Sequence, residues 1–518
     1  MTLKEALDKG EFVITCEFVP GRGKGGPAIE AAVKFAQEAK SSGLGIHAIS
    51  LTDNPGGNPA ILPDVLGAEI QKEGIDALVH FSCRDLNRNA MESRAMALAR
   101  RGVNSVLVIT GDYTESGYEG NAPAVFDVGS VQTIKYLKDM NAGLEVPGRK
   151  RGTTETLPAT EFAVGAAVSP FKYKEEELFP QFFKLEKKVA AGADFIIPQL
   201  GYDMRKFFEI RRYMASRGLK TPVIGNVYVL SYGIGKAMAA NRIPGCVVSD
   251  ELLKVLEEES KADDKGKGAR FERAAKMVAM FKGMGFAGVH IGGFNLKTRD
   301  FALIIERAAE LDEKWEEFVP DMQFGRKGEY YMFPEPTKYT IEEPDPDPVA
   351  AIGKPRKPIP YAFSRMMHNI MFEPNPINGM MRAYFKAIPE KGILERMTHG
   401  FEWWMKRILY DCRDCGDCAL GDVAFSCPMS GCAKHQRNGA CGGSRDGMCE
   451  VYPEEKRCVW AMAYERMKSS GELDKMRTAY VPPRKGELEF TSAWYNFYNG
   501  RDHTGAAMAA AQEKNADA

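Results

Sequence analysis

Between about Glu11 and Ala309, short apolar runs alternate with amphipathic stretches. There are eight such runs, and they are continuous or nearly continuous in apolar residues, as strands buried on both faces should be. The predicted strands are FVITCEF (12–18), GIHAISLT (45–52), DALVHFSC (76–83), SVLVIT (105–110), FAVGAAV (162–168), DFIIPQL (194–200), TPVIGNVYVL (221–230) and FAGVHIGG (286–293).

The stretches between these runs have helical periodicity, for example Ala28–Ser42 and Phe271–Met284. Eight strand-then-helix units in one chain predict an α/β protein with a (β/α)8 TIM barrel. The alternative is a doubly wound open sheet, which usually carries a G-x-G-x-x-G turn after its first strand. Here the first strand is followed by PGRGKGG, and no Walker-type loop occurs. The pattern therefore favours the barrel.

The alternation ends before a segment rich in proline and charge, which should be extended and form a linker or a strap across the surface. Helical character returns after this segment. Phe401, Trp403 and Trp404 are expected to pack this part of the chain against another surface, rather than bind a ligand. Two polar insertions within the barrel region, 143–160 and 260–270, are expected to be solvated. The predicted divisions are a barrel (1–315), a proline-rich linker (316–360), a smaller helical, cysteine-rich metal-binding module (361–500) and a disordered tail (501–518).

The overall charge and composition exclude some classes of function. The formal net charge is −1, so the chain as a whole gives no electrostatic case for nucleic-acid binding. No apolar run is long enough to span a bilayer, and the first residues, MTLKEALDKGEF, contain no signal-peptide core. We therefore expect a cytoplasmic protein with no membrane insertion.

Eight of the eleven cysteines fall within one segment, residues 412–458. The first three have C-x2-C-x2-C spacing, which lets three thiolates converge on one small metal site, and the fourth precedes Pro428, as in ferredoxin-type runs. The eight candidate metal ligands, enough for two four-cysteine sites, are Cys412, Cys415, Cys418, Cys427, Cys432, Cys441, Cys449 and Cys458. Sequence spacing does not indicate which cysteines share a site.

Three kinds of chemistry compete for these cysteines. Disulfides are disfavoured because a large chain without a secretory signal is expected in a reducing compartment. Structural zinc sites usually have C-x2-C pairs separated by a longer loop, rather than a triplet. The triplet and the Cys-Pro pair favour iron–sulfur clusters, with zinc as the alternative metal.

In a TIM barrel, functional residues lie at the carboxyl ends of the strands. Glu17 is a carboxylate within an apolar strand, and burial would raise its pKa enough for general-acid chemistry. Alternatively, Glu17 has only a structural role, in an ion pair with an arginine such as Arg22 or Arg84. Asp112 follows a strand and a glycine, where it could instead cap the next helix.

Two further strand-end side chains have similar alternatives. His80 could serve a cofactor or be a hydrogen-bonded histidine with no catalytic role. The Gln199 amide could read the edge of a heterocycle or satisfy a backbone group.

Five motifs together resemble the methylenetetrahydrofolate reductase family, a family of flavin-dependent barrels. They are CEFVPGR, SLTDN, HFSCRD, ITGDY and KLEKKVAAGADFIIPQLGYD, in the family's order and spacing. The resemblance implies that Glu17 is the general acid, that Asp112 lies between flavin and pterin, and that Gln199 contacts the folate. The flavin contacts that it implies are Thr52, His80, Gly111 and Lys188, and the flavin is FAD or FMN.

The cysteine-rich segment resembles a module fused to, or encoded beside, such reductases in anaerobic and acetogenic bacteria. The matching pieces are CGDCAL, SCPMSGCAKHQRNGACGG and GMCEVYPEEKRCVW. This resemblance implies iron–sulfur centres, a hetero-oligomer, and electrons from a ferredoxin or a heterodisulfide-reductase-like partner, with NAD(P)H as the alternative donor.

The reaction expected from both resemblances is reduction of 5,10-methylenetetrahydrofolate to 5-methyltetrahydrofolate. A rival interpretation is a scaffold subunit with weak or no turnover and a zinc-stabilised docking module. A corrinoid-linked methyltransferase partner is disfavoured because no D-x-H-x-x-G motif occurs.

Overall fold

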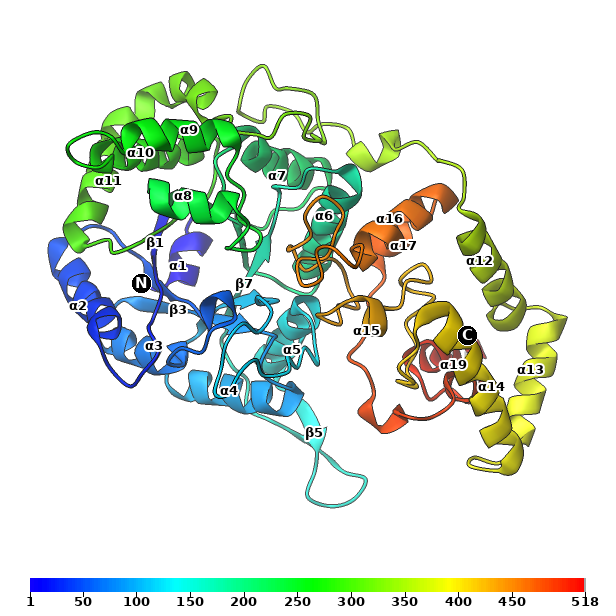
Figure 1. Ribbon diagram of the computed structural model, residues 1–518. Helices are drawn as coiled ribbons and strands as arrows, with labels where there is room; N and C mark the ends of the chain where they lie inside the picture. Colours follow the sequence, from blue (N-terminus) through cyan, green and yellow to red (C-terminus); the bar gives the residue numbers. More distant parts are fainter. Residues whose placement is uncertain (517–518) are drawn as a thin grey trace.

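The computed structural model describes residues 1–516, and Figure 1 shows a barrel joined to a smaller helical module. Eight parallel strands form one sheet in the order β8-β7-β4-β3-β2-β1-β10-β9. A parallel bridge between Ile196 and Val223 joins the two edge strands, which closes the sheet into a barrel. The strands are β1 (Val13–Phe18), β2 (Ala48–Leu51), β3 (Asp76–Ser82), β4 (Ser105–Ile109), β7 (Ala163–Val168), β8 (Phe195–Pro198), β9 (Ile224–Val229) and β10 (Gly288–Gly293). The predicted (β/α)8 barrel is confirmed.

Helices alternate with these strands and pack against them through an apolar stripe. In α2, for example, Ile29, Ala32, Phe35, Ala36 and Ala39 are buried at helical spacing. The alternating helices are α2 (Pro27–Ser42), α3 (Pro63–Lys72), α4 (Arg88–Arg100), α5 (Ser130–Ala142), α6 (Glu175–Ala190), α7 (Met204–Ser216), α10 (Lys267–Gly283) and α11 (Thr298–Leu311). Two more helices, α8 (Tyr232–Ala239) and α9 (Asp250–Glu259), lie between β9 and α10.

A short first helix, α1 (Leu3–Asp8), fills one end of the barrel. Its Leu3 and Ala6 are buried in one cluster with inward-facing strand residues such as Leu78 and Ile224. The backbone N–H of Leu3 also donates to the buried carboxylate of Asp76, at 2.9 Å. The amino-terminal end of the barrel is thus filled, which leaves the carboxyl ends of the strands for ligands.

The first polar insertion forms an exposed hairpin of β5 (Glu145–Pro147) and β6 (Thr154–Thr156). The proline-rich segment runs along α7 as a strap, with short 3-10 turns at Asp312–Met322 and Pro348–Ala351. Phe333 N–H donates to Glu209 at 2.9 Å, and Arg212 binds the Asp345 carboxylate at 2.5 Å. The strap therefore covers polar groups of the barrel.

The module after the strap consists of short helices around irregular, cysteine-bearing loops (Figure 1). They are α12 (Ile359–Phe372), α13 (Pro376–Ala387), α14 (Ile393–Tyr410), α15 (Pro428–Gly431), α16 (Val459–Ser470), α17 (Leu473–Thr478), α18 (Ala493–Tyr498) and α19 (His503–Ala516), with a 3-10 turn at Gly486–Leu488. Helix α16 packs on barrel helix α6, where Tyr464 stacks on Phe179 with ring centroids 5.7 Å apart. The domain boundaries assigned from the sequence stay a prediction.

The prediction of a disordered tail from residue 501 is wrong for most of that segment, because α19 extends from His503 to Ala516. Residues 517–518 lie outside the described part. His503 anchors the helix, since its ring contacts Asp417 at 2.5 Å and Asp422 at 3.1 Å. Burial lowers the pKa of His503, but its hydrogen bonds to the two carboxylates outweigh burial and raise the pKa to about 9.

Among the helices of residues 1–516, none combines the length and the apolar character needed to cross a membrane.

Candidate functional site

A cavity of about 240 Å³ lies at the carboxyl ends of the barrel strands. This cavity brings together most of the barrel residues that were predicted from the sequence to form the functional site. Of those side chains, Glu17, His80, Gly111, Asp112, Lys188 and Gln199 line it. Thr52 does not line it, although it lies directly after β2 and is buried.

Glu17, on β1, pairs with a histidine from the neighbouring strand. His290 Nε2 lies 3.4 Å from Glu17 Oε2, and His290 Nδ1 lies 2.8 Å from the hydroxyl of Thr15. Because β1 and β10 pair with Thr15 opposite His290, the strand register holds this ring beside the carboxylate. The alternative pairing of Glu17 with Arg84 does not form, since Arg84 binds Asp85 at 2.5 Å.

The expectation that burial raises the pKa of Glu17 is wrong for the net effect. Burial does raise it, but the lowering effects, led by the hydrogen bond and charge of His290, outweigh burial, so the pKa lies below its usual range. Glu17 is therefore a carboxylate at neutral pH in this structure. Its proton chemistry depends on His290, a residue whose partnership with Glu17 was not predicted from the sequence.

His80 lies on β3, and its Nε2 is 2.9 Å from the hydroxyl of Ser50. Burial is the main reason that the pKa of His80 falls to about 4. The imidazole is therefore neutral at physiological pH and presents a hydrogen-bonding group to the cavity without a charge.

Gly111 and Asp112 follow β4 at the cavity wall. Gly111 has φ of 87°, and a Cβ there would lie 2.3 Å from the hydroxyl of Ser82, so only glycine fits. The Asp112 carboxylate accepts a hydrogen bond from the Gly56 N–H at 3.1 Å. It does not cap the next helix, because the N-cap of α5 is Gly129.

Lys188 and Gln199 close the side of the cavity near β7 and β8. The Lys188 ammonium, buried on α6, donates to the carbonyl of Ala167, and burial holds its pKa well below the usual range. Gln199 Oε1 accepts from the Leu200 N–H at 3.0 Å, which leaves its amide NH2 for a ligand.

Part of the cavity wall comes from the cysteine-rich module, which was not predicted. Lys434, Cys441 and Glu450 line the cavity together with the barrel residues. Lys434 donates to the Gly111 carbonyl at 2.7 Å and also forms a buried ion pair with Glu450. The barrel and the module therefore form one site.

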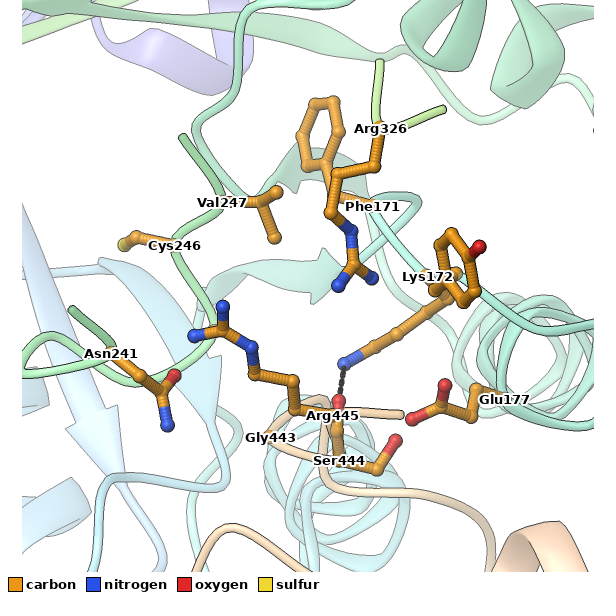
Figure 2. A pocket seen from close by; sticks show the side chains of 12 residues that line it. Phe171, Lys172, Glu177, Asn241, Cys246, Val247, Arg326, Gly443, Ser444 and Arg445 are labelled. Carbon is orange, nitrogen blue, oxygen red and sulfur yellow. Dashed lines mark hydrogen bonds between the residues drawn. The ribbon is translucent and has the colours of Figure 1, made fainter. Parts of the chain in front are cut away.

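The module loop that contributes these residues is held to the barrel by lysines. Lys172, after β7, donates to the carbonyls of Gly442 and of Ser444, the latter at 2.6 Å. Figure 2 shows the Lys172 side chain reaching this loop, with Arg326 and Arg445 beside it. Lys174 adds a hydrogen bond to the carbonyl of Asp446 at 2.9 Å. Three carbonyls of this loop thus accept hydrogen bonds from lysine ammonium groups of the barrel.

Replacing Lys434 with methionine is expected to destabilise the protein by about 3–5 kcal/mol, because it leaves the buried Glu450 carboxylate without its cation. The two side chains are only 5% and 8% exposed. The free energy of unfolding from urea titration measures the effect. The double variant Lys434→Met/Glu450→Gln is the control and should recover most of the loss; a single variant as stable as the wild type would contradict this account of the pair.

Some of the polar atoms at this end of the barrel have no hydrogen-bond partner among the described residues. The hydroxyl of Ser169 and the amide nitrogen of Gln181 line the cavity, and both atoms are buried without a hydrogen-bond partner among the described residues. The Thr52 hydroxyl after β2, outside the cavity lining, is also buried and has no partner within residues 1–516. Buried polar atoms normally have partners, so these donors and acceptors fit a polar heterocycle.

The eight late cysteines are all free thiols and separate into two groups. Each of the strongest thiol–thiol interactions joins members of the same group. Burial first, and then Cys427 and Cys412, raise the pKa of Cys415 to about 11; burial first, and then Cys441 and Cys432, raise that of Cys458 to about 12. The outer group is Cys412, Cys415, Cys418 and Cys427, and the inner group is Cys432, Cys441, Cys449 and Cys458.

Each group of four thiols is a donor set that iron–sulfur clusters and structural zinc sites share. Within residues 1–516, no three His, Cys, Asp or Glu side chains are arranged to hold one metal ion. A tetrahedral zinc site needs its sulfur ligands about 2.3 Å from the metal. An iron–sulfur cluster contains several metal and sulfide atoms, so its four thiolates stand farther apart. The donor atoms of the two groups suit an iron–sulfur cluster, with zinc as the alternative metal.

Two family models match the chain. "Methylenetetrahydrofolate reductase" matches residues 2–308, and "Methylene-tetrahydrofolate reductase C terminal" matches residues 392–487. The first covers the whole barrel and more than half of the chain. The second covers all eight late cysteines.

Two curated proteins with the same family name match the chain at low sequence identity. Methylenetetrahydrofolate reductase 2 of Schizosaccharomyces pombe is 24% identical over 49% of this chain and 39% of its own length. Methylenetetrahydrofolate reductase (NADH) 1 of Arabidopsis thaliana is 22% identical over 58% of this chain and 49% of its own length. The chain thus spans less than half the length of these two relatives.

Two solved structures are more distant. A Clostridium thermocellum protein described as binding two copies of 5-methyl-5,6,7,8-tetrahydrofolic acid is 13% identical, covers 60% of this chain and 99% of its own, and has a TM-score of 0.41. EDTA monooxygenase from Chelativorans sp. BNC1 is 12% identical, covers 58% and 93%, and has a TM-score of 0.37. Neither likeness is close enough to bear on function. On its barrel and on the match over residues 2–308, the chain belongs to the methylenetetrahydrofolate reductase family.

Proposed function

We propose that this protein reduces 5,10-methylenetetrahydrofolate to 5-methyltetrahydrofolate with a flavin, FAD or FMN, bound in the barrel cavity. The observation that carries the proposal is the convergence of Glu17, Asp112 and Gln199 in that cavity. These three residues lie at or just after strands that are far apart in the sequence. Folding of the barrel does not require these polar side chains to meet, so their convergence indicates a functional site.

Glu17 is the proton donor of the proposed reaction. Protonation of the substrate at N10 breaks its bond to the bridging carbon and leaves an iminium at N5; a bound reduced flavin supplies the hydride that converts this carbon to a methyl group. His290 lies within hydrogen-bonding distance of Glu17 and orients the carboxylate. A ligand that displaces water strengthens the burial effect, which raises the pKa of Glu17 toward that of a working acid.

The other cavity residues bind and orient. The Asp112 carboxylate, at the cavity wall, stabilises the cationic substrate, and the free amide NH2 of Gln199 contacts the pterin. His80, Gly111 and Lys188, which line the cavity, hold the flavin.

We further propose that the outer and inner cysteine groups each hold an iron–sulfur cluster and that electrons reach the flavin through this module from a partner protein. Clusters of this type supply one-electron transfer. The inner group is the nearer to the flavin site, because Cys441 lines the cavity and Lys184 of α6 interacts with Cys441 and Cys432.

The test is a turnover assay with anaerobically purified protein, loaded with FAD or FMN and reduced by a viologen dye. We expect 5-methyltetrahydrofolate to form, with flavin absorbance bands above a broad iron–sulfur shoulder. NADH and NADPH are compared as donors in the same assay. A colourless protein that contains zinc and forms no product would replace the reductase with the scaffold interpretation.

A further inference from the structure

Helix α14 has its apolar and charged faces reversed relative to an ordinary surface helix. The two side chains of this helix that are buried are carboxylates, Glu395 and Glu402. Its outward face carries Leu394, Met397, Phe401, Trp404 and Ile408, each between 54% and 67% exposed. These five follow one another at alternating steps of three and four residues, the spacing with which one helix packs along another.

The reversed orientation is fixed by buried hydrogen bonds. Glu402 accepts from the Ser492 hydroxyl at 2.6 Å and from the Trp494 N–H at 3.2 Å, and it pairs with Lys406 at 2.5 Å. Rotation of α14 about its axis to bury the apolar face would break these hydrogen bonds and leave the Glu402 carboxylate without partners. The apolar stripe therefore stays outward in the isolated chain.

Two neighbouring helices extend the apolar surface. Tyr384 of α13 shares a hydrogen bond of 2.8 Å with Thr398 of α14, and one turn away Met380 is 73% exposed. Tyr410 at the end of α14 contacts Ser364 of α12 at 2.8 Å. Figure 1 shows α12, α13 and α14 along the edge of the molecule remote from the barrel. Contiguous apolar surface of this kind marks an interaction site.

This surface adjoins the outer cysteine group. Cys412 follows α14 after one residue, and its N–H donates to the carbonyl of Lys406 at 3.3 Å. The Lys406 ammonium lies 3.9 Å from Cys418 Sγ. The carboxyl end of the apolar stripe, at Ile408, therefore lies near Cys412, whereas Lys406 and Cys418 lie on the opposite, buried face of α14.

We propose that the outer face of α12–α14 is the docking surface for a permanently bound protein subunit that carries a redox centre and presents a helix to α14. This inference rests on the proposed function, because it takes the outer cysteine group as the entry point for electrons. Transient electron-transfer encounters use small interfaces, whereas permanent ones are large and hydrophobic. Aromatic residues and methionine, which dominate this face, are the residues enriched in interface cores.

The variant that tests the surface is Met397→Glu/Trp404→Glu, and its matched control is Val65→Glu/Leu303→Glu, which places two charges on exposed apolar positions of barrel helices α3 and α11. Tagged full-length proteins are purified anaerobically from the native cells. Mass, iron, sulfide and flavin are measured for each polypeptide in the preparation.

The wild type and the control should purify as a complex with a second polypeptide that holds its own iron, sulfide or flavin. The Met397→Glu/Trp404→Glu variant should lose that polypeptide and keep its own iron. It should also keep viologen-driven folate reduction within about twofold of the wild type, since exposed substitutions leave the fold intact.

Four outcomes would overturn the docking surface: a partner without a redox centre, a partner retained by the variant, a purified chain without any partner, or a homodimer that the variant dissociates. Binding of the wild type to phospholipid vesicles, lost in the variant, would replace the protein subunit with a membrane surface. Failure of viologen-driven folate reduction in the wild type overturns the proposed function, whereas success with a retained partner overturns only the docking surface.

Discussion

Replacing Glu17 with glutamine is expected to lower the rate of folate reduction by about 10²–10⁴-fold, the range usual for loss of a general acid. Glutamine keeps the shape of the side chain and can still hydrogen-bond to His290, but it cannot donate the proton that opens the substrate. Flavin content and viologen-driven flavin reduction should stay at wild-type levels. The measurement is turnover with methylenetetrahydrofolate, alongside the flavin spectrum.

The matched variant is His290→Gln, which removes the group that holds the pKa of Glu17 down. Without the hydrogen bond and charge of His290, burial dominates and the pKa of Glu17 rises. The protonated carboxyl then persists to higher pH, so the alkaline limb of the pH–rate profile should move to higher pH. Normal turnover by Glu17→Gln, or an unmoved alkaline limb in His290→Gln, would remove Glu17 from the proposed proton transfer.

A second large effect is expected from serine substitutions in the cysteine groups. Cys415→Ser in the outer group and Cys432→Ser in the inner group should each remove about half of the bound iron and sulfide, because a cluster needs all four of its thiolates. Combining them should remove nearly all of it. Combining Cys412→Ser with Cys415→Ser should remove no more than either alone, since both belong to one group.

This pattern of additivity tests the division into groups independently of turnover. Iron and sulfide analysis and electron paramagnetic resonance of the reduced proteins provide the readouts. Cys83→Ala, a buried barrel cysteine outside both groups, is the control and should keep all of its iron. If the Cys415→Ser/Cys432→Ser variant retains as much iron as the single variants, the eight thiols form one site.

The barrel was predictable from the sequence because most strand residues are buried and leave nearly continuous apolar runs, as in β3, where all seven residues are buried. The late cysteines were equally visible, but their grouping was not, since sequence order does not state which thiols meet. The pKa of Glu17 was mispredicted because its decisive neighbour, His290, lies 273 positions away in the sequence.

Contacts between the barrel and the module were also invisible to local patterns. Gly439 gave a hint, because a Cβ there would lie 2.7 Å from the Lys184 side chain of α6, so the residue marks a close approach of the two parts. The tail was misjudged for a similar reason. Its alanine-rich composition resembles disorder, and only the distant Asp417 and Asp422 explain why His503 starts a helix.

Because Lys434, Cys441 and Glu450 wall the cavity that Glu17 and Asp112 share, the barrel alone does not enclose this cavity. Removal of the module would leave Glu17 and Asp112 open to bulk solvent on that side of the cavity.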